Sequence, residues 1–77
     1  MQVEVILFGQ LADITRREKI LVSDVIDTNG LVKAIEAQYP AMAAAKYIIA
    51  ADKKVINSNT PINEKTELAL LPPFSGG

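Results

Sequence analysis

One segment has the periodicity of an amphipathic helix, and this segment limits the folds open to the chain. Asp27 or Thr28 is a suitable N-cap, and Pro40 would end the helix because it lacks a backbone N–H and restricts the preceding residue. Apolar residues recur between them at helical spacing, at Leu31, Ala34, Ile35 and Tyr39. We therefore predict one main helix over residues 28–39, whose apolar stripe needs a partner layer.

Short runs rich in β-branched and aliphatic residues flank this helix and predict strands. Before the helix they cover residues 3–8 and 19–23, joined through 9–15, which has room for a short helical turn. Between 9–15 and the second strand, the charged stretch 16–19 is predicted to be a solvated reversal, with a partner-contacting loop as the alternative. After the helix come 47–51, 55–56 and 66–71, separated by the polar reversals at 52–54 and 57–61.

The faces of the first and last strands indicate where the core lies. Side chains alternate across a strand, so Val3, Val5 and Leu7 share one apolar face that should be buried. Ile6 and Phe8 share the opposite face. In the last strand, Leu68 and Leu70 share one face and Leu71 lies on the other.

A hairpin, one helix and further strands predict an α+β fold of the ubiquitin-like β-grasp type, a mixed sheet of four to five strands packed on one main helix. In that arrangement the first and last strands run side by side in parallel. Phe8 and Leu71 would then lie close together on the face without the helix. We interpret this apolar patch as a docking surface; scattered surface apolar residues are the alternative.

The residues after Leu71 are typical of an extended tail. Pro72 and Pro73 cannot donate to a ladder, so they end strand pairing. Gly76 and Gly77 carry no Cβ, so they could enter a narrow channel, with Ser75 as a small spacer. The functional group at the tip is the Gly77 carboxylate. We predict a single domain over residues 1–77 with a flexible tail from about 72–77; a terminus that is glycine by chance is the alternative.

Composition excludes several classes of function. The 77 residues contain no Cys and no His, which removes thiolate ligands, the commonest metal ligand and the commonest general base. No metal site and no catalytic site of its own are expected. A net charge of −1 without a basic run argues against nucleic acid, and no apolar run approaches the length of a membrane span. A cytoplasmic protein is the expectation. If the Gly77 carboxylate reacts, another protein must activate it.

Three stretches resemble a known family: Leu-Phe-Gly-Gln-Leu at 7–11, Leu-Val-Lys-Ala-Ile-Glu-Ala-Gln-Tyr-Pro at 31–40, and Leu-Ala-Leu-Leu-Pro-Pro-Phe-Ser-Gly-Gly at 68–77. They are similar to the small subunit of molybdopterin synthase, the MoaD-type sulfur carrier of the MoaD/ThiS ubiquitin-like family. The resemblance covers essentially the whole chain. Its most specific part is the ending with two prolines and two glycines.

The resemblance implies a function for the tail. The Gly77 carboxylate would be adenylated by a ubiquitin-activating-type enzyme, which uses ATP, and converted to a thiocarboxylate. The tail would enter the large catalytic subunit of molybdopterin synthase, in a heterotetramer, and donate sulfur to cyclic pyranopterin monophosphate. Phe8, Leu71 and their neighbour Ile6 match partner contacts, and Phe74 matches a tail position within the partner's groove. The chain itself would bind no cofactor.

Three other functions remain open. The chain could carry sulfur for thiamin or another sulfur pathway, although the double proline and the chain length favour the first function. It could be a ubiquitin-like modifier that is joined to lysines of other proteins. It could also be an interaction domain with an inert tail.

Overall fold

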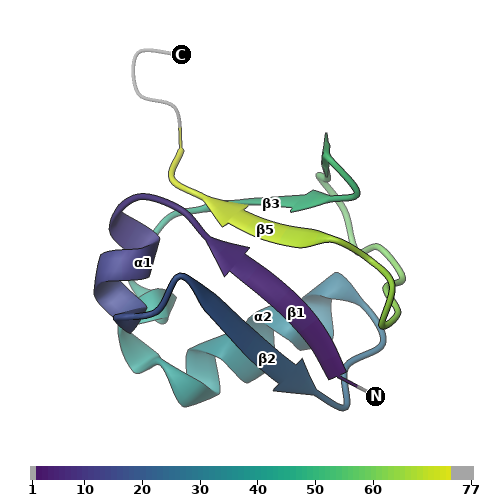
Figure 1. Cartoon of the computed structure of the whole chain (residues 1–77), viewed down its shortest axis with the longest axis horizontal. Helices are drawn as coiled ribbons and strands as arrows, with labels where there is room; N and C mark the ends of the chain where they lie inside the picture. Colours follow the sequence, from purple (N-terminus) through teal and green to yellow (C-terminus); the bar gives the residue numbers. More distant parts are fainter. Residues whose placement is uncertain (1, 74–77) are drawn as a thin grey trace.

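A computed structural model describes residues 2–73, and its strands form one five-stranded mixed sheet in the order β2-β1-β5-β3-β4 (Figure 1). The strands are β1 (Gln2–Leu7), β2 (Lys19–Ser23), β3 (Ile48–Ala51), β4 (Lys54–Val55) and β5 (Leu68–Leu71). β1 and β5 are parallel neighbours at the centre, with Val5 opposite Leu68, and the other neighbouring pairs are antiparallel. The predicted β-grasp arrangement is confirmed.

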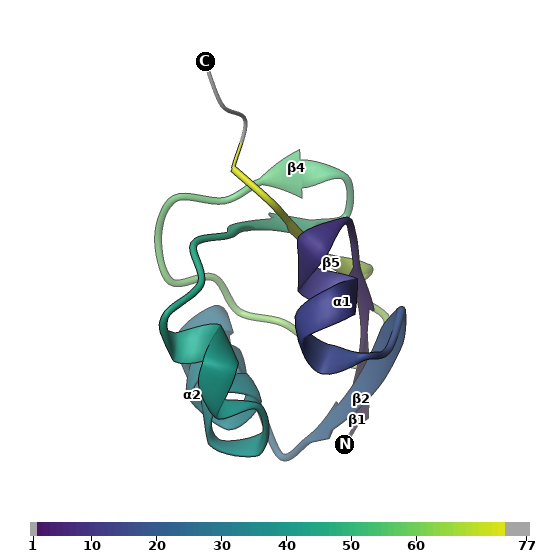
Figure 2. The same ribbon diagram turned by 90° about the vertical axis from the view of Figure 1, so that its left-hand side faces the viewer.

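One face of this sheet is covered by the main helix, α2 (Thr28–Gln38), which lies beneath the curved sheet in Figure 2. A shorter helix, α1 (Gln10–Thr15), follows β1, and the 3₁₀ helix η1 (Pro40–Ala43) follows α2. Asp27 caps α2, because its Oδ1 accepts the backbone N–H of Gly30 at 2.8 Å. The predicted helix over 28–39 is confirmed to within one residue, with Tyr39 as the C-cap.

The core lies between α2 and the sheet, and its residues are those that strand alternation predicts. Val3, Val5 and Leu7 of β1 are at most 3% exposed. Facing side chains complete this layer: Leu68 and Leu70 from β5, Leu31 and Ile35 from α2, and Leu11 from α1. Burying each such aliphatic side chain stabilises the fold by about 1.5–3 kcal/mol, so the covered face holds the domain together.

Four strands differ from the prediction by one or two residues. The first was expected at 3–8 and lies at Gln2–Leu7, and the third was expected from residue 47 and begins at Ile48. The other two differences have local reasons. The last strand was expected from residue 66, but Thr66 closes a turn in which its Oγ1 accepts the N–H of Asn63 at 2.9 Å. The fourth strand begins at Lys54 instead of residue 55, because Asp52 and Lys53 alone form the turn that reverses the chain. Within residues 2–73, no helix has the length and apolarity needed to cross a membrane.

Candidate functional site: the outer face of the sheet and the root of the tail

The sheet face opposite α2, here called the outer face, is apolar at its centre. Ile6 and Phe8 are 41% and 46% exposed, and Ala69 and Leu71 are half-buried. Because β1 and β5 are parallel, with Ile6 opposite Ala69, these four side chains share one face. Phe8 donates its backbone N–H to the Leu70 carbonyl at 3.0 Å, which places it at the same end as Leu71. The structure thus brings together the predicted partner-binding residues.

A small hollow of about 200 Å³ lies in the outer face. It is lined by apolar side chains with one residue of each charge: Ile6, Phe8, Ala50, Leu68, Ala69, Lys53 and Glu67. Ala50 is only 8% exposed and yet lies outside the core cluster, because its position opposite Ala69 turns it away from α2. A hollow of this size fits a single apolar side chain of a partner rather than a nucleotide.

Gly9 determines where the chain leaves the sheet. It adopts φ 57° and ψ −133°, a conformation that residues with a Cβ rarely adopt. A Cβ built at Gly9 would lie 2.9 Å from Cγ of Pro72, so the first proline after β5 passes directly against this glycine. The sequence placed Gly9 only at the start of the connection 9–15 between the first two strands. A glycine after an apolar strand was the available signal, but its contact with Pro72 depends on the parallel pairing of β1 with β5.

The turn between β3 and β4 borders the same hollow. Asp52 and Lys53 both have positive φ, at 50° and 69°, which suits a tight hairpin turn. Asp52 is fixed by Glu67, the residue before β5: its Oδ1 accepts the N–H of Glu67 at 2.9 Å, and its N–H donates to the Glu67 carbonyl at 2.8 Å. This pair of bonds holds Lys53 beside the hollow, which sequence analysis did not predict.

The predicted tail falls partly within the described chain. Pro72 is half-buried and Pro73 is exposed. The predicted insertion residues Phe74, Ser75 and Gly76, and the predicted reactive Gly77, lie outside the described residues. β5 ends at Leu71, and Figure 1 shows the chain continuing past the end of this strand and away from the sheet.

Titratable groups with shifted pKa values lie away from the outer face. The backbone N–H of Gly30, and then the Asn59 amide, hold the pKa of Asp27 below its ordinary value. Burial, and then the Glu36 carboxylate, raise the pKa of the Tyr47 phenol. Over residues 2–73, no group of His, Cys, Asp and Glu side chains could hold a metal ion.

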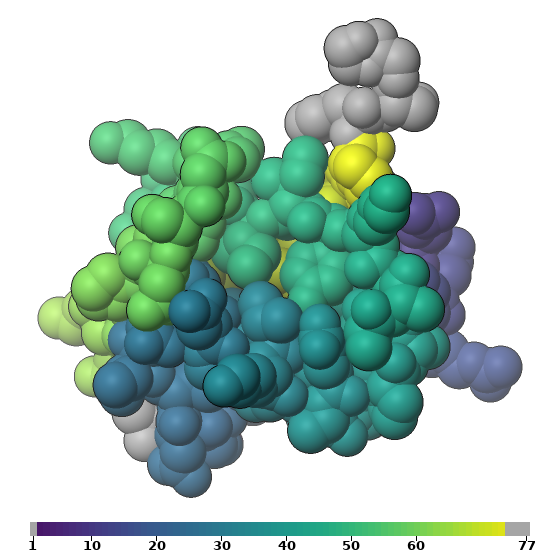
Figure 3. Space-filling model, turned by 180° about the vertical axis from the view of Figure 1, so that it is seen from behind, coloured from purple at the N-terminus to yellow at the C-terminus, as the bar shows by residue number. Residues whose placement is uncertain are grey.

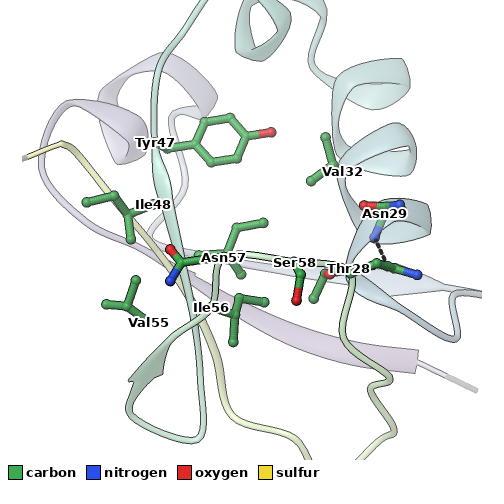
Figure 4. A pocket seen from close by; sticks show the side chains of 11 residues that line it. Thr28, Asn29, Val32, Tyr47, Ile48, Val55, Ile56, Asn57 and Ser58 are labelled. Atoms are coloured by element: carbon green, nitrogen blue, oxygen red, sulfur yellow. Dashed lines mark hydrogen bonds between the residues drawn. The ribbon is translucent and has the colours of Figure 1, made fainter.

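A larger groove of about 410 Å³ lies between α2 and the 55–59 segment, on the side seen in Figure 3. In the close view, Tyr47 points across it toward Val32 of α2, and Asn57 and Ser58 lie on the opposite wall (Figure 4). No lining side chain is a carboxylate or a cation. The groove therefore offers no countercharge for a phosphate or carboxylate, and it does not border the hollow beside Phe8.

Comparison with known proteins identifies the family. The model of the ThiS family matches residues 5–77. The chain belongs to the ThiS family. This ThiS-family chain has no match among curated protein sequences.

Solved structures share the fold of this ThiS-family chain. SAMP1 from Haloferax volcanii has a TM-score of 0.82 and 21% identity, with 100% of both chains covered. The small archaeal modifier protein 1 (SAMP1) from Methanosarcina acetivorans has a TM-score of 0.81 and 20% identity, covering 99% of this chain and 96% of that one. These likenesses establish the β-grasp fold.

A third solved structure is closer in sequence and less close in shape. It is a chain in the protein–protein complex of subunits 1 and 2 of molybdopterin-converting factor from Helicobacter pylori. The identity is 26% and the TM-score is 0.62, with 100% of both chains covered. This structural neighbour was therefore solved together with a partner subunit.

Proposed function

We propose that this chain is the sulfur-carrier subunit of a molybdopterin synthase. The observation that carries the proposal is the junction of the apolar outer face with the start of the tail, where Phe8, Leu71 and Pro72 lie at one end of the sheet. A partner that covers this patch receives the chain beyond Pro72 at a defined point. The sequence of that chain ends in Gly76 and Gly77.

In this proposal the chemistry belongs to the Gly77 carboxylate. An oxygen of the carboxylate attacks the α-phosphate of ATP on a ubiquitin-activating-type partner, and pyrophosphate leaves. A sulfur nucleophile then attacks the acyl-adenylate and AMP leaves, which gives a thiocarboxylate. On the large catalytic subunit, the thiocarboxylate sulfur would attack a carbon of cyclic pyranopterin monophosphate as an oxygen substituent leaves that carbon, which gives a thioester. Water would then hydrolyse the thioester, which leaves the sulfur on the substrate and restores the Gly77 carboxylate. The carrier has no catalytic site of its own and binds no cofactor.

Two observations support a partner at the outer face. Its hollow is lined almost entirely by apolar groups, and desolvated apolar pockets are where interfaces gain most of their binding energy. The Helicobacter pylori neighbour forms a complex of two subunits, and its identity to this chain, 26%, is the highest among the three structures compared above. We therefore expect a heterotetramer with two copies of each subunit, with the outer face buried against the large subunit.

The experiment is an intact-mass measurement after incubation with ATP, a sulfur donor and the adenylating partner. Replacement of one oxygen by sulfur adds about 16 Da at an activated carbonyl of this kind. The matched control is the chain with one alanine added after Gly77, which we expect to remain unmodified. No mass change with a partner shown to be active on another carrier would contradict the proposal.

A second arm separates the competing functions. Purified thiocarboxylate is mixed with the large subunit and cyclic pyranopterin monophosphate, and dithiolene formation is followed. Sulfur transfer to a thiazole precursor instead would indicate the thiamin pathway. Intact chain joined through Gly77 to lysines of other proteins, without any thiocarboxylate form, would indicate a protein modifier.

A further inference from the structure

The second interaction surface that we infer lies at the free edge of β2, away from the outer-face hollow. β2 is the terminal strand of the sheet and pairs only with β1. The N–H of Leu7 donates to the Glu18 carbonyl, which fixes the phase of the antiparallel ladder. Because hydrogen-bonded and non-bonded pairs alternate, the backbone groups of Lys19, Leu21 and Ser23 point away from β1.

These outward groups are available to another strand. Within residues 2–73, the outward backbone groups of Lys19, Leu21 and Ser23 form no hydrogen bond with another segment of the chain. The Leu21 side chain is 55% exposed, and Lys19 and Ser23 are exposed as well. An unpaired strand edge of this kind is a template for a further strand.

A groove of about 390 Å³ lies beside this edge, between β2 and the carboxyl end of α2. Ile20, Leu21 and Tyr39 give it apolar lining, and Gln38 adds an amide. The charged lining residues are the cations Arg17 and Lys19 and the carboxylate Glu4, which is paired with Lys19. It has no lining residue in common with the hollow that contains Phe8. In Figure 1, β2 lies along the margin of the sheet beside β1, and the sheet order places β4 at the other margin. The hollow of the outer face is lined from β1, β5 and the β3–β4 end and not from β2, so a partner seated in it leaves the outward edge of β2 uncovered.

Positive charge at one end of the groove favours a partner segment with acidic side chains. Arg16, Arg17 and Lys19 cluster where β2 begins, together with Glu18. Lys19 lies 3.6 Å from Glu4, and both side chains are more than half exposed, so this ion pair is weak and exchangeable. In the part of the chain that the structure describes, neither Arg16 nor Arg17 has a carboxylate within ion-pair distance. A lysine on an edge strand opposes edge-to-edge pairing with the strands of other proteins. A strand with acidic side chains is the favoured partner, because its carboxylates would face the cations.

We propose that the β2 edge binds an extended peptide segment of a partner protein by strand addition. The segment pairs its backbone with Lys19, Leu21 and Ser23. Because successive strand side chains point to opposite faces, one apolar side chain lies over Leu21 on the outer face and the next lies over Tyr39 on the α2 side. Acidic side chains at one end of the segment are directed toward Arg17. This surface is independent of the Gly77 chemistry. The charged stretch at 16–19 is then a partner contact rather than only a solvated turn.

The test is an NMR titration of the full chain with a seven-residue peptide of alternating valine and threonine that carries two aspartates at its carboxyl end. We expect shifts at residues 19–23, slower amide exchange at Lys19, Leu21 and Ser23, and weaker binding in added salt. A control peptide with lysines in place of the aspartates should bind about tenfold more weakly, because it loses two charge pairs. Equal binding of both peptides, or no shift at millimolar concentration, would overturn the proposal.

Variants at one position separate strand addition from simple apolar contact. Leu21→Pro removes an N–H that faces away from β1, a place where an edge strand tolerates proline, and it should abolish peptide binding. Leu21→Thr keeps that N–H and should bind within a few-fold of the parent. Thermal unfolding checks that both variants are folded. If Leu21→Pro unfolds, Arg17→Glu, at an exposed side chain, should reverse the preference to the lysine peptide.

Two further outcomes count against the proposal. Peptide-induced shifts centred on Phe8 and Ala50 would show that the peptide uses the outer face instead. The chain could also form a dimer in sedimentation experiments. If Leu21→Thr keeps that dimer and Arg17→Glu strengthens it, the β2 edge pairs with a second copy of the chain. Thiocarboxylate formation at Gly77 should be unaffected by the Leu21 and Arg17 variants, so the two proposals fail separately.

Discussion

Leu70 and Leu71 are adjacent leucines on β5, but their side chains lie on opposite faces of the sheet and differ in exposure. Leu70 is fully buried between the sheet and α2, whereas Leu71 is half-buried on the outer face. The same contrast separates Leu7 from Phe8 on β1, at 3% and 46% exposed. At the end of the two strands where these residues lie, both faces of the sheet are apolar. Within residues 2–73, only the inner face is covered by a helix. The covered face stabilises the domain, and the outer face is available for recognition.

Leu70→Ala should have the largest effect on stability. Truncation of a fully buried leucine leaves a cavity, and such substitutions cost about 2–5 kcal/mol. Leu71→Ala is the matched control and should cost about 1 kcal/mol or less, because its side chain is already in contact with water. Urea unfolding of the two variants measures the difference. Similar losses for both would show that the two faces are not distinct.

Gly9→Ala should have an intermediate effect at the boundary between β1 and the tail. A residue with a Cβ in this conformation costs about 1–3 kcal/mol, and the new methyl group would also collide with Pro72. Pro72→Ala in the same chain should relieve the collision but not the backbone strain. A double-mutant cycle on unfolding free energy measures that coupling. Perfectly additive effects would contradict the contact between Gly9 and Pro72.

Phe8→Ser should separate recognition from stability. At 46% exposure Phe8 adds little to the core, so we expect a loss of about 1 kcal/mol or less in unfolding free energy. Binding to the proposed large subunit, measured by calorimetry, should weaken by at least about tenfold, as for an anchor residue at the centre of an interface. The matched control is Leu21→Ser, which changes an exposed apolar side chain on β2 instead and should leave binding to the large subunit unchanged.

Asp27→Ala should have the smallest effect and should depend on pH. The ionised carboxylate accepts the Gly30 N–H, and that bond holds its pKa below 3.8. Because the pKa of Asp27 is lower in the folded state than in the unfolded state, the ionised carboxylate stabilises the fold at pH values above the unfolded-state pKa. This contribution to the free energy of unfolding is lost as the pH falls through the folded-state pKa. The variant should therefore unfold at a lower temperature than the parent at pH 7, and the gap should narrow below about pH 4. A gap that widens in acid would contradict this assignment.

Sequence alone predicted the elements because local patterns determine them. Alternation in β1 and β5 identified which side chains are buried, and the cap at Asp27 with the stop before Pro40 bounded α2. The parallel pairing of β1 with β5 followed once the β-grasp was predicted, and with it the proximity of Phe8 and Leu71.

What sequence did not predict depends on contacts between distant segments. The approach of Pro72 to Gly9, and the bonds between Asp52 and Glu67, need the assembled sheet. The start of β5 was placed too early because the turn at Asn63 is closed by the Thr66 hydroxyl, which no periodicity reveals. The tail beyond Pro73 lies outside the described residues, so the assignments at Phe74 to Gly77 stay predictions.

The parallel pairing of β1 with β5 also means that the docking patch is assembled from segments far apart in the sequence. Phe8 comes from near the beginning of the described chain and Leu71 from near its end. A partner that requires both side chains at once therefore engages only molecules that have completed folding, and an unfolded chain with the same last residues offers it nothing to hold. If the proposed adenylating enzyme requires this patch, the sheet geometry would restrict activation of the tail to folded molecules.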